Sequence, residues 1–214
     1  MGREMDVQRF HAEYDYHPDD RIRLFDAIAK HADSGPVLYP GSYIDIAPSV
    51  FYDDVTYVDM DRRAARFFAQ ADQVAQLVDQ KRAAAGRSPL GSATVRFQQA
   101  DYNDPLPLTD GSVRLLVSLY AGFVSERCSR YLASGGWLLA NNSHGDASMA
   151  SLDPAYSLAA VVTSRGGDYR VSTQDLGRYM IPKNGHAPSA EALHQTNKGV
   201  AFTHPAFAYL FERG

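Results

Sequence analysis

The stretch VLYPGSYIDIAPSVFYDDVTYVDMD, residues 37–61, contains two short strands separated by a tight crossover. Residues 37–39 and 55–58 are rich in β-branched and aromatic side chains, which favour the extended conformation. The first run ends at Pro40-Gly41 and the second ends at Asp59. Pro48 limits the helix between them to about one turn, because proline cannot continue a helix from within. Two strands joined through a short helix predict the beginning of a parallel α/β sheet.

Helical spacing is found on both sides of this stretch. Residues 20–29 carry apolar side chains at helical intervals after Asp19 or Asp20, and Ser34-Gly35-Pro36 ends that helix. Residues 62–85 are predicted as one long helix that ends at Gly86. Its apolar positions recur at i, i+4, i+7 and i+11 and would line one face: Phe67, Ala71, Val74 and Val78.

Further strands follow in the second half of the chain. Residues 95–97 predict a short strand, and residues 113–120 and 137–140 are nearly continuous apolar runs. Such runs are typical of strands buried on both faces, as in a parallel sheet. Between the last two, a helix is predicted from Val124, Cys128 and Tyr131 or Leu132, which would share one face, with Gly135-Gly136 after it.

The last third of the chain has a different pattern. Residues 158–162 and 169–172 flank Arg165-Gly166-Gly167-Asp168 and predict a hairpin. Residues 172–175 have capping-box spacing before a short helix, residues 189–197 predict another helix, and residues 206–211 predict a closing strand.

The predicted fold class is therefore α/β: a doubly wound, mostly parallel sheet with helices on both faces and an antiparallel C-terminal strand. No linker long enough to separate two domains is visible. We expect one domain, in which residues 1–34 form a helical extension, residues 35–142 a nucleotide-binding core, and residues 143–214 complete the sheet and the substrate side.

Composition limits the classes of partner. Apolar residues make up 45% of the 214 residues, charged residues make up 21%, and the net charge is -4. The balance gives no reason to expect nucleic acid or an anionic membrane as partner, so a small-molecule ligand is expected. A single cysteine, Cys128, excludes an internal disulfide, and the histidines match no compact metal motif. With no signal peptide and no apolar run of roughly 20 residues, a cytoplasmic protein is expected, of undetermined oligomeric state.

The polar residues at the predicted strand ends are the first candidates for a ligand site. In an open parallel sheet the loops after the strands surround a crevice. Gly41 lets the backbone approach a ligand closely, and free amides at Gly41-Ser42 would suit an anionic or polar group. An ordinary turn would use the same glycine.

Two aspartates follow later strands. Asp59 comes 18 residues after Gly41, close to the spacing of roughly 20 at which an acid hydrogen-bonds a ribose diol. Asp61 could take that role, although capping the next helix is its simpler use. Asp101 could accept from an exocyclic amine while Tyr102 covers a purine face, or Asp101 could form an Asx-turn.

The order of these motifs resembles that of class I S-adenosylmethionine-dependent methyltransferases. The segments are VLYPGS, VTYVDMD, FQQADYNDPLPLTDGSVRLLVSLY and YLASGGWLLANN, over roughly residues 35–142. The resemblance implies a Rossmann-like fold with S-adenosylmethionine as cofactor. It assigns Gly41 to the first glycine of the cofactor loop, Asp59 to the ribose-binding acid, and Asp101 to the residue that contacts the adenine amine. The chain also resembles a group of bacterial proteins with YPGS and YVDMD signatures.

The chain departs from the family pattern in the cofactor loop. Tyr39 stands where the family usually has an acidic residue, and Tyr43 and Asp45 stand where it usually has two further glycines. Side chains at those positions would crowd the path of the methionine moiety. Asp45 could replace the missing acid by pairing with the amino group of the ligand. Cofactor contacts are accordingly expected from Tyr39, Gly41, Ser42, Asp45, Asp59, Asp101 and Tyr102.

Two residues are candidates for the reaction itself. Residues 119–122 fall where the family places groups near the methyl and the substrate, and the Tyr120 ring could face a sulfonium. His144 follows a predicted strand end and has a suitable pKa for a general base. The alternatives are that Tyr120 is a core or pocket-wall aromatic and that His144 is a solvated loop histidine.

Three functions remain open at this point. The first is methyl transfer from S-adenosylmethionine to a small molecule or protein, and the second is a non-catalytic module that holds a nucleotide or metabolite in a degenerate site. The third is an assembly role. A dehydrogenase is disfavoured, because the first loop lacks the repeated glycines that accommodate a pyrophosphate.

Overall fold

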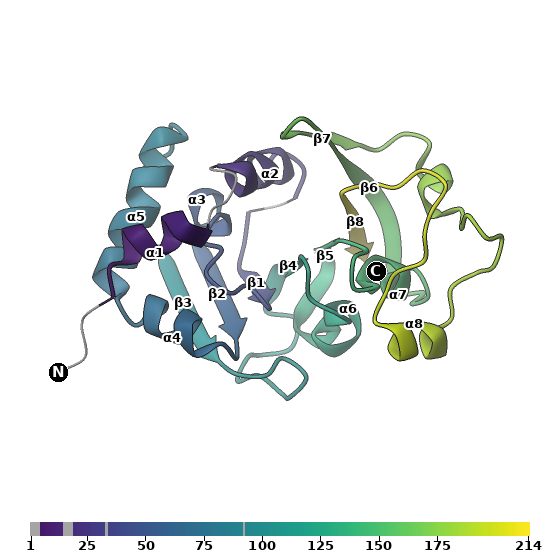
Figure 1. Ribbon diagram of the computed structural model, residues 1–214, viewed down its shortest axis with the longest axis horizontal. Coiled ribbons are helices and arrows are strands. Elements are labelled where there is room, and N and C mark those ends of the chain that lie inside the picture. The colour runs from purple at the N-terminus through teal and green to yellow at the C-terminus, as the bar shows by residue number, and fades with distance from the viewer. Residues whose placement is uncertain (1–4, 15–18, 33, 92) are drawn as a thin grey trace.

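The computed structural model describes residues 5–14, 19–32, 34–91 and 93–214, which form an α/β fold around one sheet of eight strands (Figure 1). The strand order is β3-β2-β1-β4-β5-β8-β6-β7. Strands β3 to β5 in that order pair in parallel, and β8, β6 and β7 pair antiparallel, which confirms the predicted fold class. The strands are β1 Val37–Pro40, β2 Asp54–Asp59, β3 Thr94–Gln99, β4 Val113–Ser118, β5 Leu132–Ala140, β6 Tyr156–Arg165, β7 Asp168–Ser172 and β8 Ala208–Arg213.

Strand β1 lies in the middle of the parallel part of the sheet. Val37 is paired with Val55 of β2 on one side and with Leu115 of β4 on the other. All four residues of β1 are buried. Because β1, β2 and β4 run in the same direction, the loops that follow them emerge at one edge of the sheet.

Five helices cover one face of the sheet. They are α1 Val7–Tyr14, α2 Asp20–Ile28, α3 Pro48–Phe51, α4 Arg62–Phe68 and α5 Ala71–Ala84. In Figure 1 the helices α1, α4 and α5 lie to the left and α2 and α3 above the strands. Their buried side chains share one core with β1, β2 and β4, which includes Phe25, Val50, Phe67, Val78 and Tyr57. Helix α3 has only four residues, as predicted, but Pro48 is its first residue and so begins the helix, which ends where Tyr52 becomes extended.

A second core lies on the other face. It is covered by α6 Val124–Arg127, the 3-10 turn η1 Ser129–Tyr131 and α7 Asp146–Ala150, with η2 Leu176–Met180 and α8 Ala190–Thr196 beyond them. Cys128 and Tyr131 are buried there with Leu116 and Leu138. Helices on both faces of a mostly parallel sheet give the doubly wound arrangement.

The prediction of one long helix over residues 62–85 is wrong in one respect, because the helix is interrupted after Phe68. Gln70 leaves helical geometry with φ -88° and ψ 57°, and α5 begins at Ala71, which is exposed. Phe67 and Phe68, the last two residues of α4, are both buried, and the break follows directly after them. The Phe68 ring stacks on Phe97 of β3 with centroids 4.7 Å apart.

The helix predicted after Val124 is also shorter than expected. Helix α6 ends at Arg127, and β5 already begins at Leu132, where it pairs with Val113. Gly135-Gly136 therefore lies inside a strand, at a register irregularity, with Gly135 at φ 69°. Pairing with β4 satisfies backbone groups that a longer helix would have to satisfy internally.

The C-terminal third agrees with most of the predicted pattern. Strands β6 and β7 form the expected hairpin, and β8 inserts between β5 and β6. The Ser189 hydroxyl accepts from the N–H of Ala192 and so caps α8. The capping box predicted at Ser172 is wrong: its hydroxyl accepts from Gln174, and η2 begins only at Leu176.

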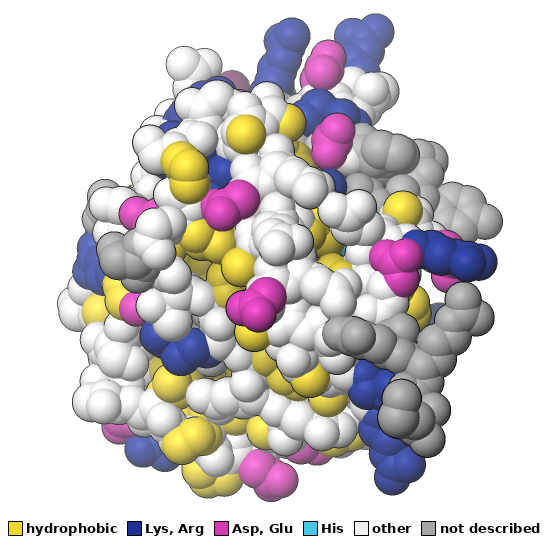
Figure 2. All heavy atoms as spheres, turned by 90° about the vertical axis from the view of Figure 1, so that its left-hand side faces the viewer, with side chains coloured by type: hydrophobic (Ala, Val, Ile, Leu, Met, Phe, Trp, Pro, Cys, Tyr) yellow, Lys and Arg dark blue, Asp and Glu magenta, His cyan; other side chains and the backbone are white. Residues whose placement is uncertain are grey.

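The surface on the β3 side mixes apolar and charged groups. Figure 2 shows hydrophobic side chains in small patches between Lys, Arg, Asp and Glu side chains. On β3 itself, Arg96 forms an ion pair with Asp54 and donates a hydrogen bond to the hydroxyl of Thr56, both on the neighbouring strand β2. In the described part of the chain, no helix combines the length and the apolar character needed to span a bilayer.

Candidate functional site

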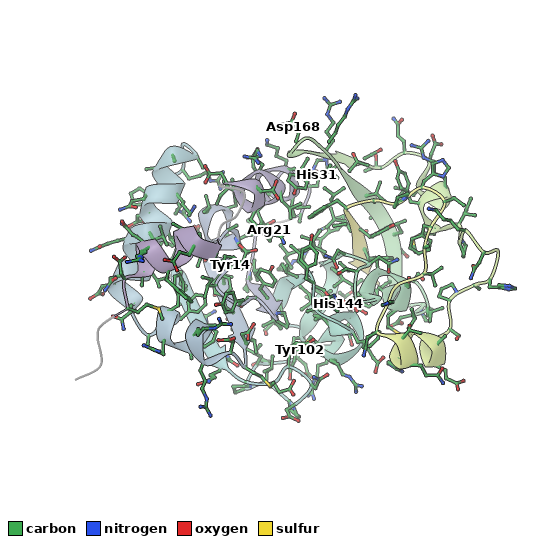
Figure 3. The ribbon with its side chains drawn as sticks, in the orientation of Figure 1. Tyr14, Arg21, His31, Tyr102, His144 and Asp168 are labelled. Carbon is green, nitrogen blue, oxygen red and sulfur yellow. The ribbon has the colours of Figure 1, made fainter. Side chains whose placement is uncertain are left out.

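The ends of β1, β3 and β4 touch one another at Gly41. A Cβ on Gly41 would lie 2.9 Å from Ala121 Cβ and 3.8 Å from Tyr102 Cε1, and Gly41 has φ 65°. A glycine is therefore required here both by the backbone conformation and by the neighbouring side chain. Figure 3 shows Tyr102 and His144 in the lower middle of the molecule, Arg21 above them and Tyr14 to the left.

The backbone amides of the β1 loop are already used within the fold. The N–H groups of Gly41 and Ser42 donate to Val58 O at 2.8 Å and 3.4 Å. The N–H of Tyr43 donates to Asp59 Oδ2 at 2.8 Å, and that of Asp45 donates to Ser42 O at 3.0 Å. The expectation of free amides at Gly41-Ser42 is therefore wrong, because β2 and its terminal acid take these donors.

Asp59 is half-buried at the end of β2. Its Oδ2 accepts from Tyr43 and its Oδ1 accepts from the N–H of Asp61 at 2.8 Å. Each carboxylate oxygen has two acceptor positions, so one on each oxygen remains for a further donor. The adjacent Met60 is 61% exposed, which leaves an apolar side chain available beside the carboxylate. The neighbouring Asp61 caps α4 by accepting from Arg63, which was the simpler alternative for it.

Asp101 and Tyr102 lie at the end of β3. Asp101 Oδ1 accepts from the backbone N–H and the side-chain amide of Asn103, so the Asx-turn alternative is present. The Tyr102 hydroxyl donates to Gly122 O at 3.1 Å, which ties the β3 loop to the β4 loop. Burial is the main cause that raises the pKa of Tyr102. Within the described residues, Asp101 Oδ2 accepts no hydrogen bond and is open to a further donor.

Tyr39 and Asp45 form a buried pair beneath the β1 loop. The Tyr39 hydroxyl donates to Asp45 Oδ2 at 3.1 Å, and Asp45 Oδ1 accepts from the N–H of Ala47. Asp45 is only 3% exposed. The pKa of Tyr39 is raised well above its ordinary value, chiefly by burial and secondly by the nearby carboxylate of Asp45. Asp45 is thus engaged by the protein itself.

Arg21 of α2 is a functional candidate that the sequence pattern missed. Its Nε lies 3.6 Å from Asp45 Oδ2, and its guanidinium stacks 4.9 Å from the centre of the Tyr120 ring. Its Nη1 is buried and has no hydrogen-bond partner among the described residues. Burial acts to lower the pKa of Arg21, but four neighbouring groups, with Tyr39 and Asp45 the largest, together outweigh it and raise the pKa above the ordinary value. No sequence signal pointed to Arg21, because nothing in α2 predicts contact with a strand end.

The Tyr43 ring turns toward the N-terminal helix. Tyr43 has φ 48°, and its ring centroid lies 5.2 Å from that of Tyr14 and 6.4 Å from that of Phe10. The guanidinium of Arg63 lies over the same ring at 5.4 Å. The residue that replaces a glycine in the family pattern thus anchors α1 to the β1 loop.

Tyr120 follows β4 and takes an unusual conformation. It has φ 60°, its N–H donates to Asn141 Oδ1 at 3.3 Å, and its side chain is 51% exposed. A non-glycine residue at positive φ is strained, and residues of this kind cluster at functional sites. Tyr120 lines a cavity of about 360 Å³ together with Asn141, Ser143 and Phe207.

His144 lies beside this cavity, at the end of β5. It is exposed, and its Nδ1 lies 3.0 Å from the hydroxyl of Ser143, which lines the cavity. A Cβ on Gly122 would approach His144 Cβ to 3.7 Å, so His144 also neighbours the β4 loop. The structure thus gathers the sequence-predicted residues at one edge, with Tyr120 on the cavity wall and His144 next to it. Within the described ranges no three His, Cys, Asp or Glu side chains are placed to share a metal ion.

The comparisons with known proteins give structural relatives. No protein-family model matches the chain, and no curated protein matches its sequence. An S-adenosylmethionine-dependent methyltransferase from Thermotoga maritima aligns over 98% of this chain and 96% of its own, with 11% identity and a TM-score of 0.50. The YcgJ protein from Bacillus subtilis aligns over 90% and 97%, with 17% identity and a TM-score of 0.46.

The first of these similarities shows that the chain has the fold of that methyltransferase across nearly its whole length. At 11% identity it concerns the fold alone. The function must therefore be inferred from the residues at the strand ends.

Proposed function

We propose that the protein is a methyltransferase that uses S-adenosylmethionine as methyl donor. The observation that supports this most is the half-buried carboxylate of Asp59, at the end of β2 and directly below the β1 loop, in a sheet of this strand order. In such sheets the ligand crevice lies at the carboxyl ends of the strands where the order reverses, here between β1 and β4.

The residues present fit the two ends of such a donor. At one end, Asp59 has an open acceptor position on each oxygen for a ribose diol, and Met60 and Tyr102 offer apolar surface for a purine. At the other end, Arg21 Nη1 is a buried donor in need of a partner, as a carboxylate would be. Asp45 does not fit the amino group, because Tyr39 and Arg21 already engage it.

When bound, S-adenosylmethionine supplies a methyl group on a sulfonium, which a lone pair of the acceptor attacks as the carbon–sulfur bond breaks. The contribution of this chain is to hold the reactants in line, which can supply much of the rate. Tyr120 is proposed to present its ring face to the positive charge. His144, paired through Nδ1 with Ser143, is proposed to take the acceptor proton on Nε2.

Calorimetric titration with S-adenosylmethionine and S-adenosylhomocysteine tests the proposal. We expect binding of both, weakened in Asp59→Asn and unchanged in Asp61→Asn, because Asp61 caps α4 and faces Arg63. The neighbouring acid is a matched control for charge and position. Absence of binding to either compound at about 1 mM, which corresponds to roughly -4 kcal/mol, would contradict the proposal.

A second function is favoured by a specific observation, namely that the β1 loop has no free amide at Gly41, Ser42 or Tyr43. A non-catalytic module that binds a nucleotide or metabolite would need only the acids at the strand ends. A thermal-shift comparison of adenosine, nucleotides and the methyl donor separates the two. Stabilisation by adenosine equal to that by the methyl donor favours the module, and stronger stabilisation by the donor favours the enzyme.

A further inference from the structure

The cavity beside Tyr120 has aromatic walls. Its volume of about 360 Å³ is within the size range of small-molecule sites, and it opens at the carboxyl ends of β4 and β5. Four rings line it: Tyr120, Phe202, Phe207 and Tyr209. Phe202 and Tyr209 are buried and pack edge to face at 5.8 Å, so two of the four walls are held by the core. Rings of this kind favour a flat, unsaturated ligand.

Asn141 offers a hydrogen-bond donor to the cavity. Its Oδ1 accepts from the N–H of Tyr120 at 3.3 Å and from the hydroxyl of Ser143 at 3.0 Å. Because the Tyr120 N–H can only donate, these contacts fix which end of the Asn141 amide is the oxygen. Its NH₂ group has no recorded hydrogen bond within the described chain, and Asn141 is one of the lining residues.

The charge of the cavity is positive, unlike that of the whole chain. Lys183 lines it, and no ion pair of Lys183 is found within the ranges that the structure describes. Among the described lining residues there is no Asp or Glu. Behind the wall, the guanidinium of Arg21 stacks on Tyr120 at 4.9 Å and lies 5.9 Å from the centre of the Phe207 ring, but its charge is already paired with Asp45, so Lys183 carries the charge of the lining. A lining with one cation and no described acid favours an anion over a cation.

We propose that this cavity is the acceptor site and that the acceptor is a small aromatic carboxylate. The ring would lie against the aromatic walls, and the carboxylate would face Asn141 Nδ2 and Lys183. That the bound molecule accepts a methyl group rests on the proposed methyltransferase function. Recognition of an aromatic carboxylate is independent of that function, because the cavity can be probed without the methyl donor.

Three probes of the same shape test the charge preference: benzoate, benzamide and benzamidinium. Each is titrated into the full-length protein, and binding is followed by ligand-observed NMR. The positive cavity is expected to bind benzoate more tightly than neutral benzamide and benzamide more tightly than benzamidinium. Equal affinities, or tighter binding of the cation, would overturn the proposal.

A substitution at the cavity mouth tests whether Lys183 causes the preference for benzoate. Lys183→Gln is expected to weaken benzoate binding about two- to fivefold, as for an exposed ion pair, and to leave benzamide binding unchanged. Lys183 is exposed, so the variant is expected to fold. Lys30→Gln, in the exposed turn after α2 and in a different groove, is the control and should change neither affinity. An equal loss for benzoate and benzamide in Lys183→Gln would count against recognition by charge.

Failure of this inference can be told from failure of the proposed function. A protein that binds S-adenosylmethionine but shows no preference for benzoate retains the function and loses the acceptor class. A protein that binds benzoate through Lys183 and does not bind the methyl donor retains the aromatic carboxylate site and loses the acceptor role.

Discussion

Asp59 Oδ2 accepts the backbone N–H of Tyr43 at 2.8 Å, so the acid at the end of β2 shapes the loop that follows β1. A ligand that binds Asp59 would therefore also affect the position of the β1 loop. The carboxylate has a structural role and a proposed ligand role at once, and its variants must be interpreted with both in mind.

For Asp59, replacement by Asn keeps the size of the side chain but places an NH₂ group against the N–H of Tyr43 or that of Asp61. One partly buried donor then loses its acceptor, which costs about 1 kcal/mol of the free energy of unfolding, the lower end of the range for a buried group. Urea denaturation measures that loss. A variant as stable as the parent would contradict the structural role of the carboxylate.

Gly41→Ala is expected to destabilise the protein, because residue 41 has φ 65° and the new Cβ would lie 2.9 Å from Ala121 Cβ. The backbone conformation alone costs roughly 1–2 kcal/mol in a non-glycine residue, and the close contact adds to it. The double variant with Ala121→Gly removes the contact and should recover part of the loss. No recovery in the double variant, as measured by thermal unfolding, would rule out the Cβ contact.

Arg21 and Asp45 are expected to be coupled. Arg21→Met leaves the 3% exposed carboxylate of Asp45 without its cationic neighbour, and Asp45→Asn removes the need for one. Each single variant should lose stability, and the double variant should lose less than their sum by about 1–2 kcal/mol. A double-mutant cycle in urea gives this coupling energy. Strict additivity would mean that the 3.6 Å pair contributes nothing.

The stability of the protein should depend on pH through Asp146. Burial is the main cause that raises the pKa of this carboxyl from 3.8 to about 6, against hydrogen bonds from Ser118 and Ser125 that lower it. Because the folded value lies above the unfolded one, the stabilising contribution is complete below pH 3.8 and is lost as the pH rises through about 6. Relative to Asp146→Asn, the parent should lose about 3 kcal/mol across that window.

Chemical denaturation at a series of pH values measures this difference. Asp110→Asn provides a contrast of opposite sign, since the hydrogen bond from Arg130 is the main cause that lowers the pKa of Asp110. The contribution of Asp110 is therefore present above the unfolded value of 3.8 and is lost as the pH falls below it. Identical pH profiles for Asp146→Asn and the parent would contradict the raised pKa.

Cys128 should be unreactive until the protein unfolds. The thiol is fully buried, and burial is the main cause that raises its pKa to about 12, with Asp146 the second cause. The thiolate is the reactive form, so Ellman's reagent at about pH 8 should modify the native protein only as fast as it opens. Addition of denaturant should then release the full colour. Rapid labelling of the native protein would contradict the burial.

The sequence by itself determined the class of the fold. Runs of β-branched and aromatic residues and nearly continuous apolar runs predicted the parallel strands, and the turn at Gly166-Gly167 predicted the C-terminal hairpin. The short crossover was also predicted, although Pro48 begins helix α3 and does not limit it from within. These features depend on local chemistry and burial pattern, which are visible in one dimension. The ends of the strands, and hence the candidate residues Gly41, Asp59 and Asp101, could be located in the same way.

The tertiary structure alone decided what those residues contact. The amides of the β1 loop are satisfied by Val58 and Asp59, and Tyr43 packs on α1, because β2 and α1 meet the loop in space. Likewise Arg21 reaches Asp45 and Tyr120 from a helix distant in the chain from β4. Hydrogen-bond partners and ion pairs across such distances leave no periodic trace in the sequence, so only the folded arrangement could show them.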